Sequence, residues 1–433
     1  MRLFKKNGMK KMKKETFLKI DIIPKENEMK QKNNNLQQIN NYIYENEKTY
    51  NNDNTYIEIS TVQTKKDLYN FFKISEYVYK NDIFWVQPLW KETKDFFKKT
   101  NPFWNHAESN LFIAYKNNKS VGRIASFIDY NYCKKIGEKI GFFGFFECIQ
   151  DYKVAYELLE KNKNWHKSKK TKIIYGPING GIDVGLGFLA EGYKTEPYFK
   201  SSYSPRYYID FVKRYGMVES KVFLEHVFDL NDVISQLFKK NINNYKENDI
   251  KIRRFKRLQT NKDIDIFIDI LNETFSSHWG FVQSSKDEIK NRFGIKQARW
   301  ILNPNLFLFA ENNNKPVGFI LSFPDYNQIL KKFNGKIGIK EIFYYLFNKK
   351  KINRGKLYII GRNKKYHNKN IAYLLNYQTF INMKKLGYNE AVIGPVDNDN
   401  IAAKKIIKNM GGKISKKFLI LEQKIGLEEE VLK

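Results

Sequence analysis

The chain has 433 residues, of which 42% are hydrophobic and 16% aromatic, so it holds enough apolar material for more than one packed core. Its two cysteines, Cys133 and Cys148, argue against a disulfide scaffold and a cysteine-based zinc site, and they suit a reducing cytoplasm. No apolar run of roughly 18 residues is present, so we expect no membrane-spanning helix. The lysine-rich start lacks the apolar core of a secretory signal.

The formal net charge of +31 has three interpretations. Lysine, asparagine and isoleucine are abundant throughout, so a solvated coat of lysines is the simplest one. The charge would also attract an acidic partner, either the phosphates of a cofactor or an acidic carrier protein. Nucleic-acid binding is the third interpretation, but no zinc-finger, homeodomain or RNA-binding signature supports it.

Residues 1–52 are polar and without periodicity, which predicts a disordered tail. After this tail the first half predicts strands at 56–63, 111–115, 121–130, 141–147, 172–175 and 222–228, and helices at 65–79, from Asp151 onward, and at 205–215. Asn117-Asn118-Lys119 is a hairpin signal, and Asp151 is a helix N-cap signal. A long glycine-rich loop follows Gly176-Pro177.

The second half predicts a similar order of elements. Strands are expected near 252–257, 305–310, 316–323, 356–361, 391–393 and 417–423, and helices after Asp263, at 370–386 and at 400–410. Residues 328–354 form a lysine-rich helical insertion that the first half lacks.

The two halves also share residues at a constant offset of about 196 positions. The first copy carries Ala114, Asn117, Asn118, Lys119, Val121, Gly122, Ile124, Ser126, Phe127 and Asp129, and the second carries Ala310, Asn313, Asn314, Lys315, Val317, Gly318, Ile320, Ser322, Phe323 and Asp325. Further on, Ile174–Ile178 is matched by Val392–Val396. We therefore predict a tandem duplication of one α/β domain with a mixed sheet, with a first lobe at 53–230 and a second lobe at 231–433.

The predicted order of elements resembles the GNAT (acyl-CoA N-acyltransferase) superfamily. In that superfamily a strand feeds a loop of the form Arg/Gln-x-x-Gly-x-Gly/Ala, which opens a helix; the matching stretch here is His367–Ala372. Segments such as Gly144–Glu147 and Trp279–Val282 also resemble a group of two-lobed bacterial GNAT-like proteins of largely unassigned substrate. The loop departs from the pattern at Asn370, where the family usually has glycine, and at His367, where it has Arg or Gln.

The resemblance implies acetyl-CoA or another acyl-CoA as donor, with its pyrophosphate at the start of a helix. The candidate cofactor-binding residues in the second lobe are Gly361, Arg362, Lys364, His367, Asn368, Lys369, Asn370, Ile371, Ala372 and Asn400. The equivalent region of the first lobe carries Glu147 and Asp151, whose negative charges would repel a phosphate. We therefore expect only the second lobe to bind the cofactor, although its lysines could simply belong to the general coat and Asn400 could simply cap a helix.

Acyl transfer to an amine needs a deprotonated amine, a polarised thioester carbonyl and protonation of the leaving thiolate. Glu147 stands where the family often has its base, and Asp325 follows a strand of the second lobe, so both are candidate catalytic residues. Glu147 could equally stabilise a helix start, and Asp325 could form a turn, as Asp129 would in the first lobe. Asn179 and Tyr203, at the two ends of the long loop, are candidate substrate-binding residues, and Tyr203 could instead pack in the core.

These features together predict an acyltransferase of the cytoplasm that transfers an acyl group from acyl-CoA to a small-molecule or peptide amine held between the lobes. No metal site is expected, because His278 and His367 are isolated in the sequence. Three alternatives remain open at this point. One is transfer from an acyl carrier protein or an aminoacyl-tRNA, and another is a GNAT-like binding protein without catalytic activity. The third is a nucleic-acid binder.

Overall fold

The computed structural model describes residues 56–181, 185–239, 249–293, 302–366 and 370–425. The predicted tail at 1–52 lies outside these residues.

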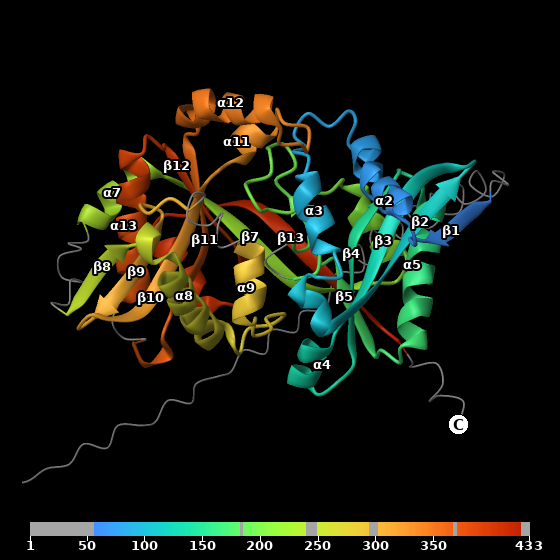
Figure 1. Cartoon of the computed structure of the whole chain (residues 1–433), viewed down its shortest axis with the longest axis horizontal. Helices are drawn as coiled ribbons and strands as arrows, with labels where there is room; N and C mark the ends of the chain where they lie inside the picture. The colour runs from blue at the N-terminus through green and yellow to red at the C-terminus, as the bar shows by residue number, and fades with distance from the viewer. Residues whose placement is uncertain (1–55, 182–184, 240–248, 294–301, 367–369, 426–433) are drawn as a thin grey trace, which may run out of the picture. The chain divides into compact units, whose positions relative to one another are not determined.

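The described strands form one mixed 13-stranded sheet, to which both repeats contribute (Figure 1). The first repeat supplies β1 (Ile57–Thr61), β2 (Ala107–Lys116), β3 (Lys119–Asp129), β4 (Ile140–Cys148), β5 (Ile173–Gly176), β6 (Phe188–Glu191) and β7 (Val218–Asp229). The second supplies β8 (Ile250–Arg254), β9 (Phe307–Asn312), β10 (Lys315–Pro324), β11 (Arg354–Arg362), β12 (Glu390–Asp397) and β13 (Lys413–Lys424).

The helices follow a similar order in the two repeats. The first repeat carries α2 (Lys65–Val78), α3 (Trp90–Phe96), α4 (Tyr130–Ile136), α5 (Tyr152–Ser168) and α6 (Tyr207–Arg214). Helix α7 (Leu230–Lys239) follows β7 and packs on a core of the second lobe. The second repeat carries α8 (Thr260–Phe275), α9 (Lys286–Phe293), α11 (Asn327–Leu330), α13 (Ile371–Lys385) and α14 (Ile401–Asn409), together with α12 (Ile339–Asn348) in its insertion. Short 3-10 turns lie at Pro102–Asn105, Arg257–Gln259, Lys349–Lys351 and Lys364–Tyr366.

Local sequence signals account for several of these elements. Asn117 and Asn118 have φ angles of 52° and 58°, and Asn313 and Asn314 have φ angles of 48° and 63°. Asparagine tolerates this left-handed region better than most residues, so both predicted hairpins form, as β2–β3 and β9–β10. Asp151 accepts a hydrogen bond from the Lys153 N–H at 2.9 Å and starts α5, as predicted.

Two predicted boundaries differ from the structure. Helix α8 begins at Thr260, before Asp263, which lies in its first turn and forms an ion pair with Arg253 Nη2 at 2.8 Å. The short strand β6 lies inside the segment predicted to be a glycine-rich loop, where it pairs with β13 of the other repeat. A strand that is completed by a distant partner leaves little local signal in the sequence.

The two repeats exchange their last strands. In the sheet order β1-β2-β3-β4-β5-β13-β7-β12-β11-β10-β9-β8, strand β13 pairs with β5 of the first repeat, and β7 pairs with β12 of the second. β7 and β13 also pair with each other, antiparallel, at the centre of the sheet. The tandem duplication is thus confirmed, with like topology in both copies, and each copy is completed by the final strand of the other.

Helices cover both faces of the sheet in each lobe, because neighbouring strand residues point to opposite faces. In the first lobe Phe143 packs in the core beneath α5, whereas Phe142 packs in the core beneath α2. In the second lobe α13 covers one core and α8 covers the other. The first lobe therefore lies around β1–β5 and the second around β8–β12, on either side of the exchanged pair (Figure 1).

A buried ion pair joins the lobes near this centre. Lys356 of β11 and Glu225 of β7 form a salt bridge in which both side chains are fully buried. Lys356 Nζ also donates to Ser201 Oγ at 2.9 Å, and Lys416 Nζ of β13 donates to Thr195 Oγ1 at 2.7 Å. Loop residues of the first repeat are thus fixed onto strands of the second by charge-assisted hydrogen bonds.

Candidate functional site

The two parallel strands β11 and β12 diverge in the middle of the second lobe. They pair only from Arg354–Leu357 against Glu390–Ile393; beyond that point β11 continues to Arg362, whereas Val396 and Asp397 of β12 face β7. We call the space between the diverging strands the second-lobe splay. Past Leu357, the described part of β12 no longer pairs with β11, so backbone groups of β11 face this space.

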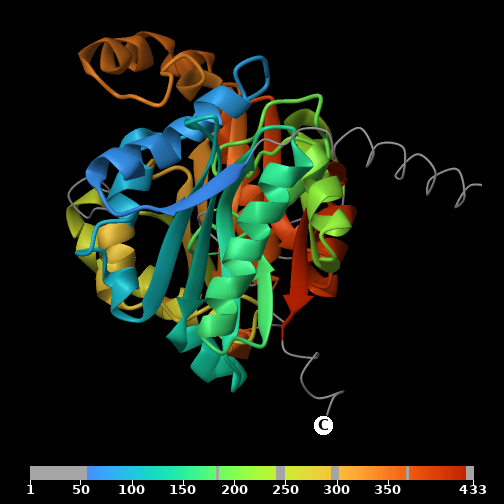
Figure 2. The same ribbon diagram turned by 90° about the vertical axis from the view of Figure 1, so that its right-hand side faces the viewer.

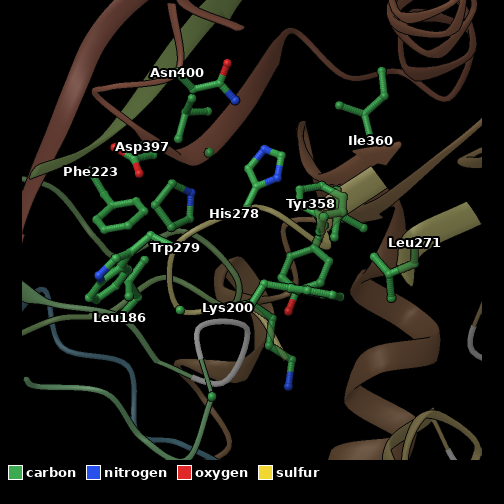
Figure 3. Close-up of a pocket in the computed structure, with 18 of the residues that line it drawn as sticks. Leu186, Lys200, Phe223, Leu271, His278, Trp279, Tyr358, Ile360, Asp397 and Asn400 are labelled. Carbon is green, nitrogen blue, oxygen red and sulfur yellow. The ribbon is translucent and has the colours of Figure 1, made fainter. Parts of the chain in front are cut away.

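A cavity of about 330 Å³ occupies the second-lobe splay. Its walls there are Tyr358, Ile359, Ile360, Asp397, Ala372 and Asn400, from β11, β12, the first turn of α13 and the start of α14. The cavity continues into the space that has α8 and α9 on one side and the first lobe on the other. Its walls are mostly apolar there and include Leu186, Phe223, Phe267, Leu271, Phe275 and Ile289. We refer to it as the main cavity (Figure 3).

The equivalent space in the first lobe is filled by the chain itself. Strands β4 and β5 pair only from Ile140–Phe142 against Ile173–Tyr175. Just beyond, the Ile178 N–H donates to the Phe143 carbonyl at 2.8 Å, and Asn179 Oδ1 accepts from the Phe145 N–H at 2.6 Å. A Cβ on Gly144 would lie 2.1 Å from the Ile178 carbonyl oxygen, so backbone meets backbone closely there. A ligand in this first-lobe space would have to displace this segment.

The helix starts next to the two splays also differ. Helix α13 begins after Asn370, which has a φ of 37° and makes no side-chain capping bond, and Ala372 in its first turn lines the main cavity. The left-handed φ explains why asparagine can replace the glycine of the family pattern. In the first lobe, Asp151 caps α5 and pairs with Lys116 Nζ at 3.1 Å, so a carboxylate already lies at that helix start. Only the start of α13 combines an uncapped helix N-terminus with access to a cavity, among the two compared.

The basic loop before α13 is held by one acidic residue that lies outside the loop. Glu273 of α8 accepts hydrogen bonds from Asn363 Nδ2 at 2.9 Å and from the Lys364 N–H at 3.3 Å. Lys364 Nζ donates to Ser276 Oγ at 3.1 Å. These contacts fix the first residues of the loop on α8, several residues before the α13 N-terminus.

The other predicted cofactor-binding residues have separate positions. Gly361 is packed so closely that a Cβ would lie 2.6 Å from the Phe319 ring, which gives this glycine a packing role. Arg362 ends β11, and Ile371 is buried in the core beneath α13. His367, Asn368 and Lys369 lie outside the described residues. Asn400 lines the main cavity while its Oδ1 accepts from the Ala403 N–H at 3.0 Å, so the predicted cap exists beside the cavity.

The two predicted catalytic carboxylates lie in ion-paired networks. Asp325 is fully buried, 2.6 Å from Arg354 Nε, and accepts from the Phe199 N–H at 2.8 Å. Glu147 is partly buried, 3.5 Å from Arg123 Nη2, and the Tyr208 hydroxyl donates to it at 2.7 Å. Burial raises the pKa of both carboxyl groups, and the neighbouring arginines oppose that shift. Neither residue is among those that line the main cavity, so their catalytic role stays a prediction without support from position.

The predicted substrate residues Asn179 and Tyr203 line a second cavity of about 220 Å³. It adjoins the main cavity, because Gly185, Lys200 and Ser202 contribute to the walls of both. The structure therefore brings these two residues together, at a site connected with the second-lobe splay.

His278 lines the main cavity, although the sequence did not indicate it as a residue of the site. It follows α8, immediately before the Trp279–Val282 segment, and its imidazole projects into the cavity between Tyr358 and the side formed by Asp397 and Asn400 (Figure 3). Burial lowers its pKa below the usual 6.5, while the negative charge of Asp397 opposes the shift. Its Nδ1 is buried and has no hydrogen-bond partner among the described residues.

A second histidine joins the lobes at the cavity wall. His106 Nδ1 lies 3.0 Å from Asp129 Oδ1, and His106 Nε2 lies 3.1 Å from Glu288 Oε1 of the second repeat. The two carboxylates raise the pKa of His106 to about 10, so it is a cation at neutral pH. His106 therefore acts as a charged bridge between lobes, whereas His278 is a neutral base exposed to the cavity.

These features define the fold. Duplicated β-α-β-β-β-α-β-α-β units, diverging parallel strands and a helix start at the open splay are the tandem GNAT fold, so the chain has a tandem GNAT-like fold. A solved structure described as a tandem GNAT protein from the clavulanic acid biosynthesis pathway superposes with a TM-score of 0.52, covering 86% of this chain and 99% of the other at 6% identity. That likeness concerns the fold alone.

Two curated proteins are similar in sequence. One is named a bacterial ceramide synthase, from Caulobacter vibrioides (strain NA1000 / CB15N); it is 24% identical over 376 residues, which cover 85% of this chain and 97% of that protein. The other is Protein YghO from Escherichia coli (strain K12), 25% identical over 279 residues, which cover 64% of this chain and 71% of that protein. A search of protein-family models found no match.

Proposed function

We propose that this protein is an N-acyltransferase that binds an acyl-CoA in the second-lobe splay and transfers its acyl group to an amine. The observation that carries the proposal is the difference between the two splays. In the second lobe the diverging strands enclose a cavity that reaches a helix start, whereas in the first lobe the chain fills the equivalent space. The N-terminus of α13 and the basic residues before it would hold the pyrophosphate.

The reaction needs a base for the attacking amine, and His278 has the required position and charge. The amine nitrogen attacks the thioester carbonyl carbon, the new C–N bond forms, and the C–S bond breaks to release CoA thiolate. His278 accepts the proton that the nitrogen loses, and this proton then passes to the thiolate. Burial keeps His278 neutral at pH 7, so it is ready to accept a proton. Backbone N–H groups on the side of β11 that faces the splay beyond Leu357 would polarise the carbonyl oxygen.

The apolar part of the main cavity favours a long acyl chain. Phe267, Leu271 and Ile289 extend the cavity away from the splay, and burying each methylene of a chain there is worth about 0.8 kcal/mol. The similar protein named bacterial ceramide synthase supports the same direction, because a ceramide is the N-acyl derivative of a lipid amine. We therefore infer a long-chain acyl donor and a lipid amine acceptor that enters through the second cavity.

Calorimetric titration of acetyl-CoA and palmitoyl-CoA into the full chain tests the proposal. Lys364→Glu with Lys369→Glu places two negative charges before α13, and we expect roughly tenfold or greater loss of affinity for both ligands. Lys153→Glu, in the first turn of α5 at the equivalent place in the first lobe, is the matched control and should bind as the wild type does. Equal weakening by both changes, or no binding of either acyl-CoA by the wild type, would contradict the placement.

A further inference from the structure

The insertion in the second repeat carries a helix whose apolar face points away from the protein. Residues 325–353 connect β10 to β11, whereas residues 130–139 suffice to connect β3 to β4 in the first repeat. On α12 the positions i, i+3, i+4, i+7 and i+8 share one face and are all large and apolar. These residues are Ile339, Ile342, Phe343, Leu346 and Phe347, with exposures of 76%, 50%, 56%, 50% and 80%.

The opposite side of α12 is the side that contacts the protein. Tyr344 packs against Phe333 with ring centroids 6.2 Å apart, and Tyr345 packs against Tyr326 at 6.2 Å. Glu341, on this same side, accepts a hydrogen bond from the Gly338 N–H at 2.8 Å. The helix therefore turns its more polar side inward and its apolar side to solvent, which is the reverse of an ordinary surface helix.

Lysines surround this apolar face. The exposed ones in the insertion are Lys332, Lys336, Lys340, Lys349, Lys350 and Lys351. Glu341 is the one acidic residue between positions 331 and 353, and it is engaged in the start of α12. A protruding apolar helix bordered by cations matches a surface that is apolar inside and anionic outside. A bilayer with anionic headgroups has this structure.

We propose that α12 is an interfacial anchor that lies in the surface of an anionic lipid bilayer. Its ten residues span about 15 Å as a helix, half of the hydrocarbon thickness, so the helix lies on a membrane and does not cross it. No helix in the described part of the chain is long and apolar enough to cross a membrane. Figure 2 shows α12 projecting beyond the helices that cover the sheet, where a flat surface can reach it.

The anchor also lies close to the second cavity. Leu330 of α11, just before the insertion helix, lines that cavity, and the Trp90 N–H donates to the Gly335 carbonyl at 2.9 Å. Trp85 to Leu89, which precede α3, form part of the same cavity wall. Docking through α12 would therefore bring the second cavity near the bilayer surface, where a lipid amine resides. The proposed membrane anchor does not depend on the proposed acyltransferase function, because it rests only on α12 and the lysines around it.

Vesicle binding by the full chain tests the anchor. We expect the wild type to sediment with vesicles of 30% phosphatidylglycerol in phosphatidylcholine at roughly 0.1 M salt, and to bind pure phosphatidylcholine much more weakly. Ile339→Glu, Phe343→Glu and Phe347→Glu together should lower binding to the anionic vesicles about tenfold or more. Leu258→Glu is the matched control, since Leu258 is 87% exposed and lies outside the insertion. The lysine-rich residues 1–55 are present in every variant, so their contribution cancels.

A tryptophan at the apolar face distinguishes insertion from charge attraction alone. The Phe347→Trp variant should show a blue-shifted emission on adding anionic vesicles, and brominated acyl chains should quench it. Unchanged vesicle binding by the triple variant, or an emission that does not respond, would overturn the proposal. If light scattering shows that the triple variant converts a wild-type dimer into a monomer and leaves vesicle binding intact, the face serves a second copy of the chain and the bilayer proposal fails.

Discussion

Replacing His278 by glutamine tests the catalytic chemistry most directly. Glutamine keeps the approximate size and polarity of the side chain but accepts no proton near neutral pH. Because His278 lines the cavity and its buried Nδ1 has no partner among the described residues, the ring is not held by a structural hydrogen bond that the change would break at that atom. We expect the fold to persist and the acyl-transfer rate to fall.

The size and the pH dependence of the effect follow from the position of the ring. Loss of a general base typically costs 10²- to 10⁴-fold in rate, which is about 3–5 kcal/mol of transition-state stabilisation. Burial lowers the pKa of His278 below 6.5, so the base form is already dominant at pH 7. The ratio of wild-type to variant kcat/KM should therefore rise with pH below 6.5 and stay constant above it. Titration of the amine itself cancels in this ratio.

A second buried histidine supplies the control. His226 of β7 also has a pKa lowered by burial and a buried Nδ1 without a partner among the described residues, but it is not part of the cavity wall. His226→Gln should keep kcat/KM within about threefold of the wild type, measured by release of free CoA thiol from palmitoyl-CoA with a long-chain amine. A His278→Gln enzyme with unchanged kcat/KM, or a ratio that still rises with pH above 6.5, would refute the assignment of the base.

Three further outcomes follow from the structure. Leu271→Trp shortens the apolar part of the main cavity. Calorimetry should then show that palmitoyl-CoA loses affinity, by up to about fourfold per excluded methylene, and that acetyl-CoA does not. Equal losses for the two ligands would contradict the proposed position of the acyl chain. His106→Gln should lower the free energy of urea unfolding by about 1–2 kcal/mol at pH 6. Because the pKa of His106 in the folded protein is about 10, the stabilisation by the charged imidazole is fully present below pH 6.5 and is lost as the pH rises through 10. A difference between wild type and variant that does not shrink by pH 10 would exclude the charged bridge to Glu288. Glu225→Ala should lower the free energy of unfolding by about 3–5 kcal/mol, because it leaves the Lys356 charge buried without its carboxylate. Adding Lys356→Met should restore much of this stability. No recovery in the double variant would show that the buried charge is not the cause of the loss.

The duplication could be predicted because matching residues recur at a constant offset, and most helices and strands could be predicted because their signals are local. The asparagine turns, the Asp151 cap and the strand and helix periodicities each depend on a few neighbouring residues, and the structure confirms them. The exchange of β7 and β13 could not be predicted in this way. Either last strand fits either lobe by its apolar pattern, and the choice depends on long-range contacts such as the buried pair of Glu225 with Lys356.

The contrast between a basic loop and an acidic one predicts a site in the second lobe, and this location stays a prediction. The structure confirms one part of the contrast, since Asp151 caps the helix start of the first lobe. His278 could not be placed in a cavity from the sequence alone, because the residues around it come from β11, β12 and the start of α14, far along the chain. The Trp279–Val282 segment next to it was the available signal, since it matched other two-lobed proteins without an evident structural role.

The exchange of strands ties the two copies together, and of their two splays in the described residues only that of the second lobe is open. Each lobe needs the last strand of the other, so neither copy can diverge into an independent domain without losing its partner's support. Once Ile178 and Asn179 fill the first splay, the first lobe is free to supply walls to the second, and Phe223 of the exchanged strand β7 lines the main cavity. If the second lobe binds the donor and the first lobe contributes to the acceptor site, a change in the first lobe should affect the acceptor alone. Removing the Asn179 amide by Asn179→Ala should loosen the first-lobe loop and alter acceptor KM, while acyl-CoA affinity stays unchanged; a parallel loss of both would mean that the first lobe also holds the donor.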